Sequence, residues 1–209
     1  MTEKEDSTLE KREVVEIDVT PTTSSPEHYD SGKEEYAIVL DFLPYGYPLE
    51  KRMMPLVQAI GEKKFTLLQL VPRRGEKFET GEKVYIGEGK RDKIYFIQGR
   101  LLREKLTENA KSELQRVIER IVSEREREFV DFFNKAEAIN TRLHQIELLP
   151  GFGKKHMKEI LEARETGNVF ESFEDLKSKV PNLPTPKKAI ERRIFEELTE
   201  IQRHNLFIA

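Results

Sequence analysis

Short hydrophobic stretches separated by turn residues dominate the chain from Tyr36 to about residue 100. They are rich in β-branched and aromatic residues, which favour strands. The five stretches cover residues 36–43, 56–60, 65–71, 84–86 and 94–97. Five strands in so short a segment predict a small OB-like β-barrel over residues 35–106. The same strand count also fits an SH3-like barrel or an open sheet.

Hydrophobic residues recur at helical spacing after Thr107, which is a suitable helix N-cap. The pattern predicts one long amphipathic helix over residues 107–138, spanning roughly 45 Å. Its apolar stripe needs a partner surface. We expect that surface to be the barrel at one end and the C-terminal domain at the other; a partner protein or a second copy of the chain is the alternative. The stripe consists of Leu114, Val117, Ile118, Ile121, Val122, Phe129, Phe132, Phe133 and Ala136.

The stretch Leu-Leu-Pro-Gly-Phe-Gly-Lys-Lys at residues 148–155 predicts a helix-hairpin-helix element. Its first helix would begin with Asn140 as N-cap, and its second would end at Arg164. Residues 180–184 stand where a second hairpin is expected, and Asn182 there tolerates a left-handed backbone. Pro184, however, has no N–H to donate. Residues 139–209 are therefore predicted to form an all-α tandem helix-hairpin-helix domain with a degenerate second hairpin, and the whole chain an α+β fold.

The predicted hairpin is a candidate phosphate-binding site. Glycines permit backbone conformations that a side chain disfavours, and their N–H groups can converge with those of the next helix on one phosphate oxygen. Such a contact holds the nucleic-acid backbone and reads no base. The alternative is an ordinary helical corner with lysines for solubility. The candidate residues are Gly151, Gly153, Lys154, Lys155, His156 and Lys158.

The predicted barrel carries a second set of candidate residues. Tyrosine rings in a Gly-Pro loop can stack on bases, and nearby cations can contact phosphates. The alternative is that many barrel aromatics, such as Tyr85 and Tyr95, face the core. The candidates on this surface are Tyr45, Tyr47, Arg73, Arg74, Lys90 and Arg91.

Charge is distributed unevenly along the chain. The net charge is −3, yet residues 1–35 hold 11 acidic and 4 basic side chains. Residues 1–34 are therefore predicted to be an acidic disordered tail, and the remainder a mildly basic body that permits nucleic-acid binding. The absence of cysteine excludes disulfides and thiol catalysis. Without a membrane-spanning run or a secretory signal, we expect a cytoplasmic protein that does not bind membranes.

No catalytic constellation is evident, and we expect neither enzymatic activity nor a cofactor. The four histidines, at positions 28, 144, 156 and 204, lack metal-ligand spacing. Lys155 resembles the position of the catalytic lysine in helix-hairpin-helix DNA glycosylases. Those enzymes also need a carboxylate in a later Gly/Pro-rich loop, whereas residues 170–176 follow the tandem-hairpin pattern instead.

Two resemblances rest on these motifs. Residues 138–200 resemble the tandem helix-hairpin-helix domains of DNA-uptake proteins, through Ile139-Asn140 and the run from Gly167 to Leu176. Residues 36–48, Tyr-Ala-Ile-Val-Leu-Asp-Phe-Leu-Pro-Tyr-Gly-Tyr-Pro, together with the hairpin at 150–153, resemble DUF655, an archaeal family of unknown function.

The DUF655 resemblance implies an OB-like barrel paired with a helix-hairpin-helix module that binds nucleic acid, with RNA favoured over DNA. A ribosomal or transcription-machinery protein is a further expected partner. Two other functions stay open: a protein-interaction scaffold on the transcription or translation machinery, and an accessory factor in DNA repair or recombination.

Overall fold

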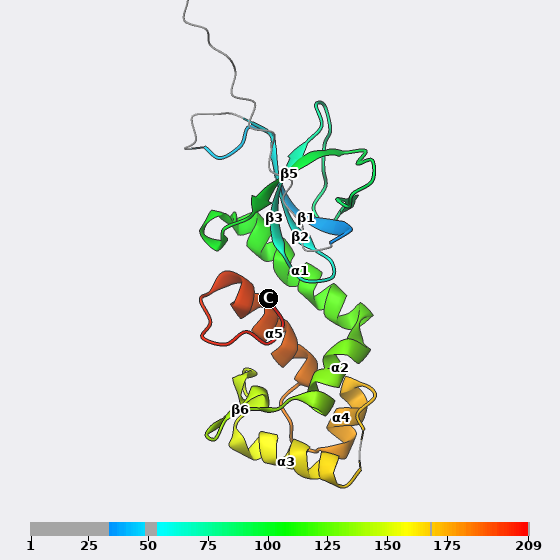
Figure 1. The fold of residues 1–209 in the computed structure, drawn as a ribbon, viewed down its shortest axis with the longest axis vertical. Helices are drawn as coiled ribbons and strands as arrows, with labels where there is room; N and C mark the ends of the chain where they lie inside the picture. The colour runs from blue at the N-terminus through cyan, green and yellow to red at the C-terminus, as the bar shows by residue number, and fades with distance from the viewer. Residues whose placement is uncertain (1–33, 49–53, 168, 209) are drawn as a thin grey trace, which may run out of the picture.

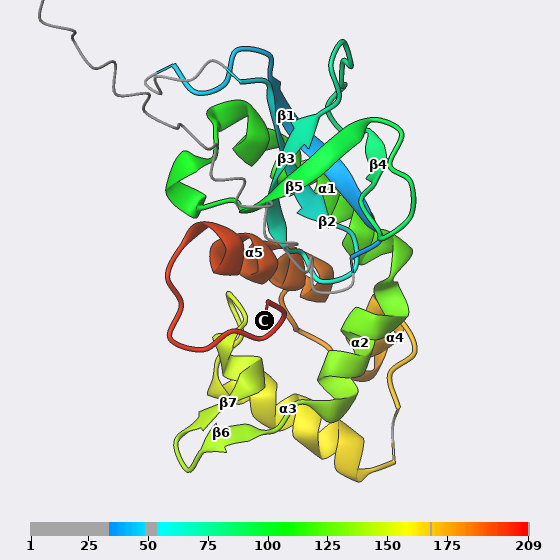
Figure 2. The ribbon, with the colours of Figure 1, turned by 45° about the horizontal axis from the view of Figure 1, so that its top comes forward.

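A curled five-stranded antiparallel sheet forms one end of the molecule (Figures 1 and 2). The computed structural model describes residues 34–48, 54–167 and 169–208. The strand order is β4-β1-β2-β3-β5, and all five predicted stretches are confirmed as strands with small shifts at their ends. The strands are β1 Tyr36–Leu43, β2 Leu56–Gly61, β3 Leu67–Pro72, β4 Lys83–Tyr85 and β5 Ile94–Arg100.

Both faces of this sheet are buried. Ala37 and Val39 of β1 belong to an apolar cluster enclosed by the curl of the sheet. Ile38 and Leu40 point to the opposite face, where they pack in a second cluster with residues of the helices. This second core runs without interruption from the sheet to the far end of the molecule, so the two ends are packed as one body.

The rest of the chain is mainly helical, which makes the fold mixed α+β. Helix α1 packs on the sheet, α5 lies beneath it, and α3 is at the end of the molecule opposite the sheet (Figure 1). The helices are η1 Arg103–Lys105, α1 Glu108–Glu124, α2 Glu126–Lys135, η2 Gln145–Leu148, α3 Lys154–Glu165, α4 Phe173–Lys179 and α5 Pro186–Thr199. No helix among these described residues has both the length and the apolarity to cross a membrane.

Thr107 caps α1, as predicted. Its hydroxyl accepts a hydrogen bond from the Ala110 N–H at 3.0 Å and donates one to Asp41 of β1 at 2.5 Å. The buried Gln58 of β2 accepts from the Thr107 N–H at 3.1 Å. The start of the helix is thus fixed to two neighbouring strands.

The predicted single helix over residues 107–138 is instead two helices, α1 and α2, which meet at Arg125. Arg125 has φ −110° and ψ 30°, outside helical values. Its guanidinium donates to the carbonyls of Glu62 and Lys63 in the β2–β3 turn and pairs with Glu128 at 2.6 Å. The chain bends where this side chain reaches back to the sheet.

The predicted helix from Asn140 to Leu149 does not form. Its place is taken by a two-stranded ladder, β6 Ala138–Asn140 and β7 Leu143–His144, followed by the single turn η2. Asn140 is not an N-cap: its side chain accepts from the Arg142 N–H at 2.9 Å, a local bond that competes with helix formation. The cap of η2 is His144, whose Nδ1 accepts from the Ile146 N–H at 3.2 Å.

The predicted acidic tail, apart from its last residue, lies outside the described residues. Glu34, which the sequence places at the end of that tail, is 1% exposed. Its carboxylate accepts hydrogen bonds from the N–H groups of Lys63 and Lys64, at 2.8 and 2.6 Å. Glu34 therefore belongs to the packed sheet.

Candidate nucleic-acid interface

The turn at residues 149–153 has the backbone geometry expected from its glycines. Gly151 has a φ of +84°, in the left-handed region that favours glycine, and Gly153 is the N-cap of α3. Between them, Phe152 is buried at 4% exposure, with its ring 5.8 Å from that of Phe133. The turn therefore anchors itself through Phe152 and leaves both glycines at the surface.

The backbone donors that follow this turn are available to a ligand. Within the described chain, the N–H groups of Lys154, Lys155 and His156 have no hydrogen-bond acceptor in the backbone, as expected in the first turn of a helix. The Gly153 N–H makes only a long bond, 3.4 Å, to Nδ1 of His156. Three open N–H groups thus lie beside one another at the start of α3.

Cations surround these donors. Lys154, Lys155 and Lys158 are all exposed, and Lys155 has only a distant carboxylate, Glu159 at 3.9 Å. His156 is half-buried against the Phe152 ring, so it is the least accessible candidate of this group. The first turn of α3 contains no acidic residue. Positive side chains are unfavourable at the positive end of a helix dipole unless an anion is present.

Other helices follow the ordinary charge preference. The first turns of α1, α2 and α4 each carry acidic residues: Glu108; Glu126 and Glu128; Glu174 and Asp175. Helix α5 is the second exception, because Lys187 and Lys188 open it and its first turn has no acid.

The turn before α5 repeats much of the first turn. Asn182 has a φ of +68°, which confirms the left-handed backbone that its position was expected to tolerate, and Leu183 after it is buried. Pro184 lies against the first turn: a Cβ added to Gly151 would be 3.6 Å from its ring. The two turns are therefore in contact.

The lysines of α5, unlike those of α3, are neutralised inside the molecule. Lys188 pairs with Glu191 at 2.9 Å and with Glu119 of α1 at 3.1 Å, and these two carboxylates raise the pKa of Lys188. Lys187 has Glu191 at 3.9 Å. The turn at residues 149–153 is therefore followed by more positive charge that is not neutralised within the molecule, and this charge can interact with a ligand.

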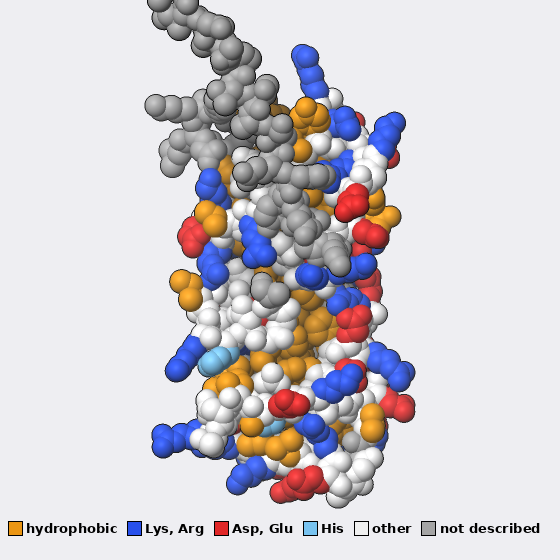
Figure 3. All heavy atoms as spheres, in the orientation of Figure 1, with side chains coloured by type: hydrophobic (Ala, Val, Ile, Leu, Met, Phe, Trp, Pro, Cys, Tyr) orange, Lys and Arg blue, Asp and Glu red, His pale blue; other side chains and the backbone are white. Residues whose placement is uncertain are grey.

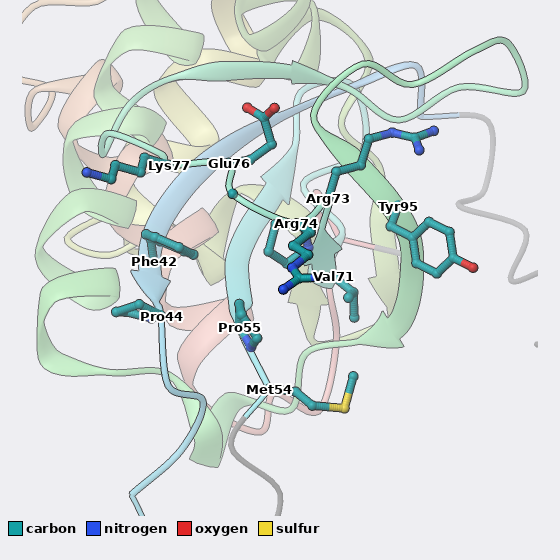
Figure 4. A pocket seen from close by; sticks show the side chains of 12 residues that line it. Phe42, Pro44, Met54, Pro55, Val71, Arg73, Arg74, Glu76, Lys77 and Tyr95 are labelled. Atoms are coloured by element: carbon teal, nitrogen blue, oxygen red, sulfur yellow. The ribbon is translucent and has the colours of Figure 1, made fainter.

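The sheet carries a cavity of about 620 Å³ that the sequence did not predict (Figure 4). It lies beside the turn after β3, and Arg73 and Arg74 are part of its wall. Tyr95, from β5, is 64% exposed and forms another wall. The complete lining is Phe42, Pro44, Met54, Pro55, Val71, Pro72, Arg73, Arg74, Gly75, Glu76, Lys77 and Tyr95.

The other predicted barrel residues occupy different positions. Tyr45 is 74% exposed but does not line the cavity. The half-buried Tyr47 directs its hydroxyl to the side-chain amides of Gln58 and Gln69, at 3.0 and 3.1 Å, and the Lys105 ammonium lies 5.0 Å from its ring. The ring of Tyr47 is thus fixed by internal contacts.

Part of the hydrogen-bonding capacity of the basic loop at residues 87–91 is used by contacts within the loop and to the adjoining strand β4. Arg91 donates to the Gly87 carbonyl at 2.9 Å, and the Tyr85 hydroxyl accepts from the Gly89 N–H at 3.0 Å. Arg73 in turn donates to the Arg91 carbonyl at 2.9 Å. Lys90 is exposed. The loop is thereby joined to the wall of the cavity.

The structure does not bring the two predicted sets of residues together. The cavity is on the sheet, while the turn at 149–153 is on the helical part near α3 (Figure 1). Lys and Arg side chains lie along the whole of the face in Figure 3, at both ends and in the middle, where hydrophobic side chains also gather. Among the described residues, no three His, Asp or Glu side chains are grouped as metal ligands would be.

Comparison with known proteins yields uncharacterised archaeal relatives. The chain is 42% identical over 188 residues to an uncharacterized protein of Methanocaldococcus jannaschii, MJ0038, covering 90% of this chain and 83% of that protein. It also resembles the crystal structure of Af1531 from Archaeoglobus fulgidus, with a TM-score of 0.74 and 47% identity, over 84% of this chain and all of that one. The family model described as "Protein of unknown function (DUF655)" matches residues 33–209, so the resemblance inferred from the sequence is confirmed and the chain belongs to this family.

Proposed function

We propose that this protein is a non-catalytic, cytoplasmic nucleic-acid-binding protein that holds the phosphate backbone at residues 151–155. A single observation carries the proposal: α3 begins with two exposed lysines, three open N–H groups and no acidic residue. An anion bound there would accept from the N–H groups and interact favourably with the helix dipole and with Lys154 and Lys155.

The second turn serves as an internal comparison. It also has a residue with a left-handed backbone, Asn182, followed by a buried apolar residue and then a pair of lysines, yet Glu191 and Glu119 neutralise the lysines. The repetition supports a tandem helix-hairpin-helix unit in which the first helix is reduced to the turn η2. We infer that the first turn contacts phosphate and the second one supports the packing.

The curled sheet supplies the second surface. Five antiparallel strands in the order β4-β1-β2-β3-β5, with an apolar cluster enclosed between them, support an OB-like barrel. Arg73, Arg74, Lys90 and Tyr45 are exposed on it. A nucleic acid that contacts both ends would lie along the long dimension of the molecule, and the helices α1 and α2 would set the distance between the contacts.

RNA is favoured over DNA as the ligand because of the family resemblance noted in the sequence. The 2′-hydroxyl distinguishes the two chemically. Binding of fluorescent single-stranded RNA, structured RNA and duplex DNA across a salt series tests both the proposal and this preference. A ribosomal or transcription-machinery protein remains the partner to seek if none of the three binds.

The decisive variant is Lys154→Glu/Lys155→Glu. We expect it to bind more weakly and to show a shallower dependence of affinity on salt, by about 0.7 in the log–log slope for each lost contact to a single strand and about 0.9 for duplex DNA. Arg116→Glu/Arg120→Glu is the matched control, since it changes the net charge equally on the exposed face of α1. Equal losses in both variants would mean that only total charge matters, and the proposed site would be wrong.

A further inference from the structure

The cavity on the sheet combines an apolar interior with a positively charged rim. Its apolar wall comes from the ends of β1 and β3, with Phe42 and Val71 among the lining residues, and from the residues just before β2, Met54 and Pro55. Its volume, about 620 Å³, is in the range of pockets that take small ligands, roughly 300–1,000 Å³. Neither the fold nor the family description explains an apolar cavity at this place.

We propose that this cavity accepts one unstacked nucleotide, with the base against Tyr95 and its phosphate at Arg73 and Arg74. The inference rests on the proposed function and extends it: the preferred ligand would have to present an unpaired base. A nucleotide within a single strand and a free mononucleotide share this chemistry, and the experiment below separates them.

Tyr95 is suited to stack on a base. Its ring meets that of Phe96 in an edge arrangement, with centroids 5.5 Å apart and planes at 74°, and 64% of the residue is still exposed. Figure 4 shows the ring at the edge of the group of lining side chains, with its hydroxyl pointing away from the others. Exposed aromatic rings on a sheet are the usual platform for unpaired bases.

The turn that carries Arg73 and Arg74, and the side chain of Arg73 itself, are held in place before any ligand arrives. The turn at residues 73–76 is closed by the Glu76 N–H, which donates to the Arg73 carbonyl at 3.2 Å, and Gly75 has a φ of +87°. The Arg73 N–H donates to the Lys93 carbonyl at 2.8 Å, and the Arg73 guanidinium is fixed to the Arg91 carbonyl. Such ordering lowers the entropic cost of binding.

The charges favour an anionic ligand. Arg74 has no ion-pair partner among the described residues, and Figure 4 shows its guanidinium over the cavity. Lys77 adds a third cation, and Glu76 is the only carboxylate among the lining residues. An apolar, planar ligand that carries a phosphate matches this combination. A duplex does not, because its bases are stacked and paired.

The experiment uses the full chain with a short unstructured RNA, the same RNA with one abasic site, and a fully paired duplex. Tyr95→Ala should lower affinity for the unstructured RNA about tenfold and leave duplex binding unchanged. Tyr95→Phe should retain the affinity because it keeps the ring. Leu102→Ala, which removes another exposed apolar side chain outside the cavity, is the control.

Two further measurements identify the occupant. RNA carrying 5-iodouridine should cross-link under ultraviolet light to the peptide that contains Tyr95. Titration with a nucleoside monophosphate separates the sources: competition at micromolar concentration indicates a free nucleotide, and its absence indicates a nucleotide within a strand. Either result, together with the loss in Tyr95→Ala, supports the inference.

Failure of the inference differs from failure of the proposed function. If Tyr95→Ala binds every RNA as wild type does while Lys154→Glu/Lys155→Glu loses affinity, the cavity is not a nucleotide site. The proposed phosphate contact at residues 151–155 is then still supported. Equal losses in Tyr95→Ala and Leu102→Ala would also overturn the inference. If wild type binds neither RNA nor DNA, the proposed function falls and the inference falls with it.

Discussion

Arg193 and Glu197 form an ion pair inside the helical part of the molecule, with Nε of Arg193 donating to Oε1 of Glu197 at 2.8 Å. The two side chains are only 7% and 0% exposed. The Glu197 carboxylate also accepts from the N–H groups of three consecutive residues, 206–208. Arg193 donates to the carbonyls of Leu148 and His204. One buried pair on α5 therefore holds two segments in place: the C-terminal segment and the end of η2, which precedes the turn at residues 149–153.

Removing one member of this pair should be costly. Glu197→Gln leaves the Arg193 charge buried and weakens the bonds to three N–H groups, so we expect it to lower the free energy of unfolding by about 3–5 kcal/mol. Urea unfolding near neutral pH measures the loss. The neighbouring pair of Arg192 and Glu196 has the same spacing but is 71% and 21% exposed. Glu196→Gln should therefore cost no more than about 1 kcal/mol, and similar losses in the two variants would contradict the assigned role.

The two glycines of the turn at residues 149–153 should respond differently to substitution. Gly151→Ala places a Cβ on a left-handed backbone and should destabilise the fold by about 1–2 kcal/mol, although the added atom has room beside Pro184. Gly153 has a φ of −107° and no atom within 4 Å of an added Cβ. Gly153→Ser should preserve stability, since serine is a good N-cap.

Gly153→Ser should weaken nucleic-acid binding even though it preserves stability. The serine hydroxyl would accept from an N–H of the first turn, the group that a phosphate needs, and would narrow the approach to the backbone. We expect wild-type stability in thermal unfolding and reduced affinity for nucleic acid. Unchanged affinity would show that the open N–H groups of α3 take no part in binding.

Thr107 offers a test of how the sheet and α1 are joined. Thr107→Ala removes the cap on the Ala110 N–H and the bond to Asp41, and should lower the free energy of unfolding by about 1–2 kcal/mol. Thr185, the N-cap of α5, makes no capping side-chain bond. Thr185→Ala should therefore have a smaller effect in the same denaturant titration, and equal effects would show that the hydroxyl bond of Thr107 contributes little.

Elements determined by local pattern were predictable from the sequence. The strand at residues 36–43, the cap at Thr107 and the left-handed Gly151 and Asn182 follow from local preferences, and each is confirmed. The break between α1 and α2 was not predictable. No glycine or proline marks it, because its cause is the bond of Arg125 to carbonyls more than sixty residues earlier in the chain.

Of the two candidate surfaces, one could be predicted from the sequence and the other could not. The turn at residues 149–153 and the start of α3 form a contiguous run, so their glycines and lysines could be recognised together. The cavity could not be, because Phe42, Arg74 and Tyr95 are separated in sequence and meet only through the pairing of β1, β2, β3 and β5. The neutralisation of Lys188 was hidden for the same reason, since Glu119 lies 69 residues away.

His144 should make η2, the segment that leads into the turn at residues 149–153, sensitive to acid. The residue is 7% exposed, and burial is the main cause that lowers the pKa of His144 from the usual 6.5. The nearby charge of Arg164 lowers this pKa further, and Glu147 acts in the opposite direction. The neutral ring accepts the Ile146 N–H that begins η2. Protonation removes that acceptor and brings a second positive charge beside Arg164.

The sign of the effect on stability follows from proton binding. Below pH 6.5 the unfolded chain protonates His144 while the folded chain still keeps it neutral, so unfolding takes up a proton and stability falls as the pH falls towards the lowered pKa of the folded state. Above pH 6.5 this contribution is complete. His144→Asn retains an N-cap acceptor that does not titrate. Between about pH 7.5 and pH 5 its urea midpoint should fall less than that of wild type, and parallel curves would mean that protonation of His144 does not affect folding.

Because η2 leads directly into the turn at 149–153, wild type should also lose hydrogen-exchange protection in that turn on acidification, and His144→Asn should keep more of it.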